Sequence, residues 1–207
     1  IWPETKLADQ VAFMEVHPEF GVLFGDARRF ADNGWTEPTL FTRYRLDATF
    51  FGSENQVVEP LRKLLTTNFI PVGTVLVRKN CLLEAGLFDE NFRRVEDWDM
   101  WLRVALRAGF AYSRDIWKLK RTHECNLSNN TEAMALSAIA VMEKLHSEHG
   151  SELTALGIDI APHLRDAYSN LGYFYLRALA LEHARKAFSV SLKHGVVARN
   201  ALYWLST

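Results

Sequence analysis

The chain has 207 residues, of which 48% are hydrophobic and 24% are charged, a balance that excludes a disordered or fibrous protein. Its formal net charge of −1 disfavours a nucleic-acid-binding protein, because such proteins carry a basic excess. No apolar run approaches the ~20 residues that cross a bilayer, and two cysteines, Cys81 and Cys125, are too few for a disulfide framework. We therefore expect a globular, cytoplasmic protein with two reduced thiols.

Helix and strand patterns alternate in the first 60 residues. Residues 3–16 predict a helix, because Leu7, Val11 and Met14 recur at helical spacing. Residues 20–24 predict a short buried strand, with residues 26–28 as its end. Residues 35–56 follow no clear period and are expected to form a loop after a turn at 33–34.

The mixed pattern continues through the middle of the chain. We expect a helix over residues 57–65, a strand over 69–78 with a Pro/Gly irregularity, and a short helix over 81–85. Gly86 suits the left-handed position that follows a helix end.

The next helix, expected over residues 96–108, has the clearest pattern. Its apolar side chains form one stripe that should be buried: Trp98, Trp101, Leu102, Ala105 and Leu106. Asp99 and Arg103 are four residues apart, which predicts an ordinary surface ion pair. Gly109 ends the helix, and a strand over 110–117 follows.

From Thr131 onward the chain is expected to be helical, with one helix ended by Gly150, a second opened by Pro162 and a third over residues 181–193. Residues 199–205 resemble the start of another helix. The sequence therefore predicts two parts: an α/β part over residues 1–128 and an all-α tail over 129–207.

Within the tail, residues 165–198 have the spacing of one tetratricopeptide-type helical hairpin. Gly172 would allow a close approach of the two helices, with Ala184 beneath it. Two interpretations stay open: a plain hairpin that packs on the preceding helices, and a peptide-binding groove.

Glu96 and Asp97 open the helix at residue 96. Carboxylates at a helix start can simply cap free N–H groups and interact favourably with the helix dipole. One of them could instead face a cleft and act as a general base, because such a base needs an anionic oxygen on a rigid element.

Residues 69–128 resemble the C-terminal part of family 2 glycosyltransferases. The resemblance rests on several short motifs in a fixed order: Gly73 and Arg78, the run Gly86-Leu-Phe-Asp-Glu90, the pair Glu96-Asp97, Leu102-Arg103, Arg121-Thr-His123 and Ser128. It implies a partial GT-A fold, a Rossmann-like mixed sheet with helices, as the expected fold class of residues 1–128.

The resemblance also implies roles for single residues. Asp97 would be the catalytic base, and Glu96 would orient the loop or contact the acceptor. Trp98, Gly73 and Arg121 would contact substrate. His123 matches a position that ligates a divalent cation, Mg²⁺ or Mn²⁺, in some of these enzymes; a loop histidine that is only hydrogen-bonded is the alternative.

The start of the chain extends the resemblance, because Trp2 matches a Trp that follows the family's acidic metal-binding motif. The acidic ligands and the nucleotide-binding half would then precede Ile1, and this fragment alone would be inactive. Asp26 with Arg28 nearby is a poor substitute metal site, since it offers one carboxylate beside a cation.

The expected activity of the whole protein is transfer of a sugar, with inversion, from a nucleotide sugar to a glycan or lipid-linked acceptor. The expected location is the cytoplasm, and peripheral association with the cytoplasmic face of a membrane and self-association of the fragment stay open. The alternative function is a non-catalytic scaffold that binds a partner through its helical tail.

Overall fold

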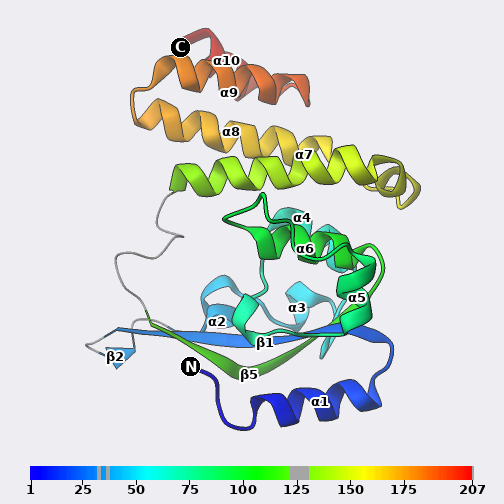
Figure 1. The fold of residues 1–207 in the computed structure, drawn as a ribbon. Helices are drawn as coiled ribbons and strands as arrows, with labels where there is room; N and C mark the ends of the chain where they lie inside the picture. The colour runs from blue at the N-terminus through cyan, green and yellow to red at the C-terminus, as the bar shows by residue number, and fades with distance from the viewer. Residues whose placement is uncertain (32–33, 36–37, 122–130, 207) are drawn as a thin grey trace. The chain divides into compact units, whose positions relative to one another are not determined.

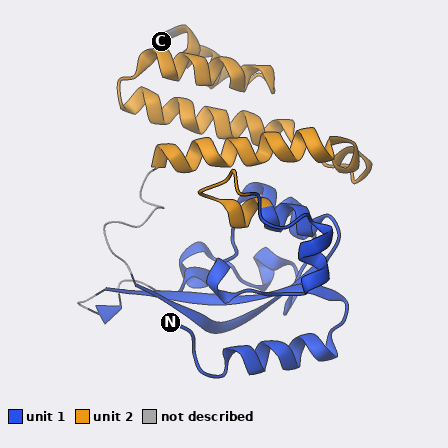
Figure 2. Cartoon of the chain, in the orientation of Figure 1, with its two compact units in different colours: residues 1–89, 100–126 blue, residues 90–99, 127–207 orange. Residues whose placement is uncertain are grey.

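The computed structural model describes residues 1–31, 34–35, 38–121 and 131–206. The chain divides into two compact units, which are coloured separately in Figure 2. Unit 1 comprises residues 1–89 and 100–126, and unit 2 comprises residues 90–99 and 127–207. A mixed α/β sheet is thus followed by a helical region, as predicted. No helix in the described ranges is both long and apolar enough to cross a membrane.

Unit 1 is built on a sheet whose centre is a parallel pair, β1 (Phe20–Ala31) and β5 (Gly109–Arg121). Three two-residue strands pair antiparallel with it: β2 (Gly34–Trp35) and β4 (Leu76–Val77) with β1, and β3 (Gln56–Val57) with β5. The strand predicted over residues 20–24 therefore continues to Ala31, and Asp26 lies inside it rather than at its end.

A bulge in β5 interrupts the parallel pair. Phe24 lies beside Tyr112 but Asp26 lies beside Ile116, so β5 carries extra residues between two close positions of β1. Gly25 is opposite this bulge, where an added Cβ would lie 2.9 Å from the carbonyl oxygen of Asp115 and even closer to the ring of Trp117. The bulge therefore requires glycine at position 25.

Helix α1 (Lys6–Val16) covers one face of this sheet, and α2 (Leu40–Tyr44) and α3 (Ala48–Phe51) cover the other (Figure 1). Met14 of α1 packs in an apolar cluster with Phe20, Leu23, Ala111 and Trp117. The predicted apolar face of α1 is wrong in part, because Leu7 and Val11 are exposed. Their places in the interior are taken by polar side chains.

A buried polar chain connects α1 to the segment before β4. The Lys6 ammonium donates to Gln10 Oε1 at 2.6 Å, and Gln10 Nε2 donates to the carbonyl of Thr74 at 2.8 Å. Burial lowers the pKa of Lys6. These bonds satisfy polar groups that would otherwise be costly to bury, which explains why the helix turns this face inward.

The predicted loop over residues 35–56 contains two short helices with side-chain caps. Thr39 accepts from the N–H of Thr42 at the start of α2, and Asp47 accepts from the N–H of Phe50 at the start of α3. Both helices deliver aromatic rings to one cluster, whose centroids lie 4.0–6.4 Å apart: Phe24, Phe41, Phe51, Phe69 and Tyr112.

The next elements are α4 (Pro60–Thr66), a 3₁₀ turn (Val72–Thr74), β4 and α5 (Lys79–Glu84). The strand predicted over residues 69–78 is therefore wrong except at residues 76–77. Gly86 follows α5 with φ +86°, as expected for a helix end. Arg103 holds this turn, because its guanidinium donates to the carbonyls of Ala85 and, at 2.8 Å, Leu87.

Helix α6 (Glu96–Ala105) begins in unit 2 and ends in unit 1. Trp98, Trp101 and Leu102 are buried as predicted, and Ala105 is half-buried. The surface location predicted for Asp99 and Arg103 is wrong, since both are buried. Spacing alone suggested a solvent-exposed pair, but both groups have partners that lie far away in the sequence.

Unit 2 stacks four helices in chain order: α7 (Thr131–Ala155), α8 (Ala161–Arg177), α9 (Leu181–Lys193) and α10 (Ala198–Ser206). Figure 1 shows this succession from yellow-green to red. The predicted bounds of α9 are confirmed. The predicted end of α7 at Gly150 is wrong, because the helix continues for five residues beyond it.

A close contact joins α8 to α9. A Cβ added to Gly172 would lie 2.7–2.9 Å from the ring of Phe188, which is fully buried. The predicted close approach at Gly172 is confirmed, although the ring of Phe188 rather than Ala184 occupies the space. Two tyrosines of α8 attach it to α7, since Tyr168 donates to Glu143 at 2.5 Å and Tyr175 donates to Glu132 at 2.7 Å.

We predict opposite effects for two Gly→Ala substitutions in unit 2. Gly172→Ala should destabilise it by about 1–3 kcal/mol, because the new methyl group overpacks the contact with Phe188. Gly150→Ala should stabilise α7 by up to about 1 kcal/mol, because the nearest side-chain atom, on His146, lies 3.7 Å from its Cβ position and alanine favours a helix. Thermal unfolding followed by circular dichroism at 222 nm checks both. Equal melting temperatures for the two variants would contradict the packing described.

Candidate functional site

The first turn of α6 carries the predicted catalytic pair. Glu96 is exposed and Asp97 is half-buried. Asp97 Oδ1 accepts from the N–H of Trp98 at 2.8 Å, and the positive end of the helix dipole also favours a carboxylate here. Trp98 itself is only 5% exposed, so its ring is part of the interior.

Asp99 fixes this turn of α6 within unit 2. Its carboxylate accepts from the Lys144 ammonium at 3.1 and 3.3 Å. The same ammonium lies 5.3 Å from the centre of the Phe92 ring. Because Asp99 is 3% exposed, water screens this ion pair little, and the pair holds Asp97 on a rigid support.

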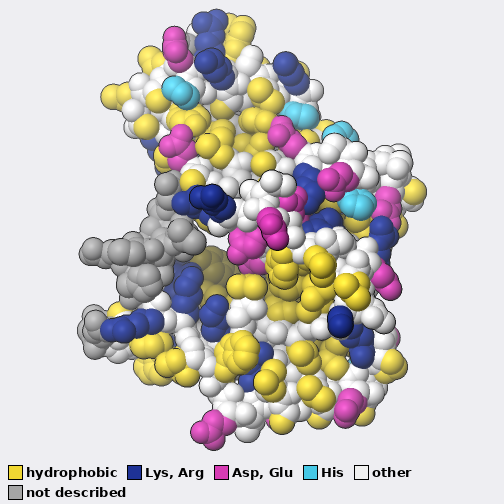
Figure 3. Space-filling view, in the orientation of Figure 1, with side chains coloured by type: hydrophobic (Ala, Val, Ile, Leu, Met, Phe, Trp, Pro, Cys, Tyr) yellow, Lys and Arg dark blue, Asp and Glu magenta, His cyan; other side chains and the backbone are white. Residues whose placement is uncertain are grey.

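The carboxyl ends of β1 and β5 carry five cations, which we call the strand-end cluster. By the strand register, one face of the sheet carries Arg29, Lys118 and Lys120, and the other face carries Arg28 and Arg121. Arg29 lies beside Lys120 in the register, and Arg121 lies beside Phe30. Figure 3 shows Lys and Arg side chains gathered at this end of the sheet. In open α/β sheets this edge is where ligands bind, and the clustered charge favours an anion.

The backbone of Ile1 meets the same edge. Its backbone nitrogen donates to the carbonyl of Leu119 at 3.0 Å, and its carbonyl accepts from the N–H of Leu119 at 2.9 Å. The first residue of the chain is therefore held two positions before Arg121. This long-range pairing was not predicted from the sequence.

Gly73 also faces the strand-end cluster. An added Cβ at Gly73 would lie 2.5 Å from the Lys118 ammonium nitrogen. Glycine therefore leaves room for this cation, which is consistent with a site for an anionic ligand. Gly73 and Arg121 lie in unit 1, whereas Glu96, Asp97 and Trp98 lie in unit 2.

Two predicted features lie outside the described residues, namely His123 and Ser128. In the described ranges no three His, Cys, Asp or Glu side chains gather in a way that could hold a metal ion.

Asp26 is a buried carboxyl in the middle of β1, 4% exposed. Its Oδ1 accepts from the N–H groups of Ala27 at 2.7 Å and Phe41 at 3.0 Å. Burial raises the pKa of Asp26, against hydrogen bonds from Thr39 and from backbone N–H groups that lower it. Asp26 thus attaches the start of α2 to the sheet.

Sequence reasoning missed two cavities in unit 1 that flank α2. One, of about 530 Å³, includes Asp26, Arg45 and Arg114. The other, of about 430 Å³, includes Arg29, Tyr44 and Phe50. Their walls come from the segment that lacked any period, so the sequence pattern contained no signal for them.

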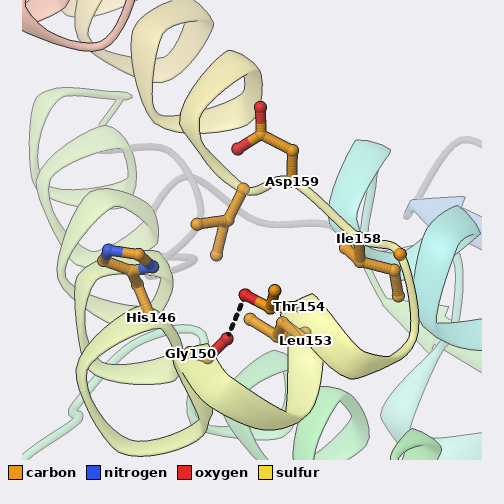
Figure 4. A pocket seen from close by; sticks show the side chains of 8 residues that line it. His146, Gly150, Leu153, Thr154, Ile158 and Asp159 are labelled. Atoms are coloured by element: carbon orange, nitrogen blue, oxygen red, sulfur yellow. Dashed lines mark hydrogen bonds between the residues drawn. The ribbon is translucent and has the colours of Figure 1, made fainter.

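Unit 2 has a smaller cavity, of about 340 Å³, where α7 turns into α8 (Figure 4). His146 and Asp159 stand at its rim, and Leu153 and Ile158 form its floor. A hydrogen bond from Thr154 to the carbonyl of Gly150, at 2.9 Å, is internal to α7. Nothing among these described groups forms a catalytic arrangement.

No protein-family model matches this chain, and no curated protein matches its sequence. The family resemblance therefore rests on the residues and their order in the chain.

Because burial raises the pKa of Asp26, the folded state binds its proton more tightly than the unfolded chain does. Asp26 therefore stabilises the folded state at low pH. This stabilisation is lost as the pH rises above 3.8, the ordinary pKa of Asp, and through the raised pKa of the folded state. The free energy of unfolding of the wild type should therefore fall relative to that of Asp26→Asn over this rise. Urea unfolding at several pH values checks this. If the free energy of unfolding of the wild type minus that of Asp26→Asn stays constant or grows as the pH rises, the burial argument is contradicted.

Proposed function

We propose that the chain is part of an inverting glycosyltransferase of the GT-A type, with residues 1–128 on the acceptor side of its catalytic domain. The substrates are a nucleotide sugar and a glycan or lipid-linked acceptor. The acceptor oxygen attacks C1 of the sugar while Asp97 takes the acceptor proton. The bond between C1 and the phosphate oxygen breaks on the opposite side, and the nucleoside diphosphate leaves.

The observation that carries this proposal is the pairing of Ile1 with Leu119. In the family pattern, an acidic motif that precedes the Trp matched by Trp2 and the Arg-x-His motif, matched at residues 121–123, serve one diphosphate. These segments are more than 100 residues apart in the sequence, and nothing in the motif match requires them to meet. The fold brings their neighbours together at the cationic carboxyl edge of the sheet.

The rigid support of Asp97 is a second argument. A general base works from a fixed position, and α6 is buried along most of its length. A divalent cation bound by the acidic motif would stabilise charge on the departing diphosphate, with His123 as a further ligand. Arg121 and Lys118 would add positive charge at the same edge.

The alternative function is a non-catalytic scaffold whose helical unit binds a partner. Exposed apolar side chains at α10 favour it, since Leu202 and Leu205 are 67% and 73% exposed. A screen of the natural protein that carries this sequence separates the two functions. Hydrolysis or transfer of any sugar from a panel of nucleotide sugars with Mg²⁺ or Mn²⁺ supports the enzyme, and complete inactivity supports the scaffold.

Asp97→Asn in the natural protein should lower the transfer rate about 10²–10⁴-fold and leave donor binding unchanged, because only the proton acceptor is removed. Asp9→Asn is a matched control, since Asp9 is an exposed carboxylate in the first turn of α1. Rates from a radiolabelled-sugar assay and donor affinities from calorimetry check this. Near-normal transfer by the Asp97 variant would remove Asp97 from the mechanism.

The 207-residue chain alone should neither transfer sugar nor bind nucleotide sugars tightly, because the proposed donor half lies outside it. Calorimetry with UDP, GDP and dTDP sugars plus Mn²⁺ checks this, and light scattering reports self-association. Binding tighter than about 10 μM, roughly −7 kcal/mol, would place the donor site within these residues.

A further inference from the structure

An ion pair inside unit 2 joins the first turn of α6 to the helical stack. Residues 90–99 belong to the same compact unit as α7–α10 (Figure 2). The pair is made by Asp99 and Lys144, which are 45 residues apart in the sequence. Their side chains are only 4% and 19% exposed, so water and salt screen the attraction little. Removal of either group would leave the charge of the other buried without this partner.

The backbone of this turn carries the constraint from Asp99 to Asp97. The N–H of Asp99 donates to the carbonyl of Val95 at 3.1 Å, and the N–H of Trp98 donates to Asp97 Oδ1 at 2.8 Å. Asp97 lies two residues before Asp99 in the same hydrogen-bonded turn. When the Asp99 side chain is held, the backbone from which Asp97 projects is therefore held as well.

Lys144 also contacts the segment that leads into α6. Its ammonium lies 5.3 Å from the centre of the Phe92 ring, a distance at which a cation and an aromatic ring attract each other. Phe92 is half-buried and belongs to unit 2. One lysine of α7 thus contacts two points of residues 90–99, one before α6 and one in its first turn.

Lys144 is itself held firmly in the stack. Val141 and Leu145, on either side of it in α7, are buried. The neighbouring Glu143 accepts from the Tyr168 hydroxyl of α8 at 2.5 Å. Burial and, after it, the hydrogen bond to Glu143 raise the pKa of Tyr168 to about 12, so the hydroxyl keeps its proton and remains a donor at neutral pH. The position of Lys144 is therefore fixed by two helices of unit 2.

We propose that Lys144 is a positioning residue for Asp97, so that the first helix of the tail is part of the support of the catalytic base. This inference rests on the proposed function and deepens it, because it adds a residue of the helical unit to the transfer reaction. Lys144 acts through Asp99 and does not touch the substrates. A displacement of a catalytic group by about 1 Å can lower a rate about 10²-fold, so a loss of this ion pair should be visible in catalysis.

Steady-state kinetics of the natural protein that carries this sequence test the role. Lys144→Met should lower kcat for transfer about 10- to 100-fold and leave the KM of the nucleotide sugar unchanged, because the base moves and the donor contacts do not. Lys144→Arg keeps a cation and should recover most of the rate. Lys186→Met is the matched control, since it removes an exposed cation of α9 in the same unit and should behave like the wild type.

The kinetic result can contradict the proposal in two ways. A wild-type kcat in Lys144→Met would overturn it directly. A fall in kcat with an equal loss of donor affinity would also overturn it, because the substitution would then damage the whole protein rather than the position of Asp97.

A second variant covers the case in which Lys144→Met fails to fold, since that substitution leaves the buried Asp99 carboxylate without the ammonium. The double variant Asp99→Asn with Lys144→Met removes both charges. It should unfold near the melting temperature of the wild type and still lose kcat, because the link between α6 and α7 is absent. A double variant with the melting temperature and the kcat of the wild type would overturn the proposal.

Amide hydrogen exchange of the natural protein reports on the same constraint without an assay of activity. The N–H groups of Trp98 and Asp99 should exchange faster in Lys144→Met than in the wild type, whereas those of α9 should exchange equally in both. Unchanged exchange at α6 would overturn the proposal. Inactivity of the wild type would overturn the proposed function and this role with it, whereas equal kcat in an active wild type and in Lys144→Met would overturn this inference alone.

Discussion

The parallel pairing of β1 with β5 is the constraint on which unit 1 depends. This pairing places the carboxyl ends of β1 and β5, which are distant in the sequence, at the same end of the sheet. The strand-end cluster lies there, and Ile1 pairs with Leu119 there. The bulge in β5 is part of the same constraint, because only glycine at position 25 admits the backbone of Asp115 and the ring of Trp117. Both faces of the pair then receive helices, and the two cavities form beside α2.

Elements whose stabilising contacts are local were predictable from the sequence. The bounds of α9 follow from its local apolar period, and the short helix before Gly86 follows from the left-handed glycine. Elements that depend on distant partners were not. The polar chain from Lys6 to Thr74 reverses the expected face of α1, and α2 is attached through Asp26, which lies 15 residues before Phe41.

The candidate site also has features that were predictable from local sequence and features that were not. The position of Asp97 at a helix start could be predicted, because acidic residues at a helix start are a local signal. The partners of Asp99 and Arg103 could not, since they lie 45 and 16–18 residues away. Spacing of four residues suggested a surface pair, yet tertiary structure assigned each group to a different neighbour. His123 lies beyond the described residues, so its role stays a prediction.

The buried polar network of unit 2 has a consequence for how its last helix is aligned. Asn200 of α10 is 2% exposed and donates to the hydroxyl oxygens of Ser169 in α8 and Ser191 in α9, at 2.5 and 3.0 Å. Apolar contacts between helices tolerate sliding, since many alignments bury similar area. If α10 shifted by one turn, the Asn200 amide would stay buried without these acceptors, and burying it unpaired would cost several kcal/mol. The side chains of Asn200, Ser169 and Ser191 thus select a single alignment of α10 against α8 and α9.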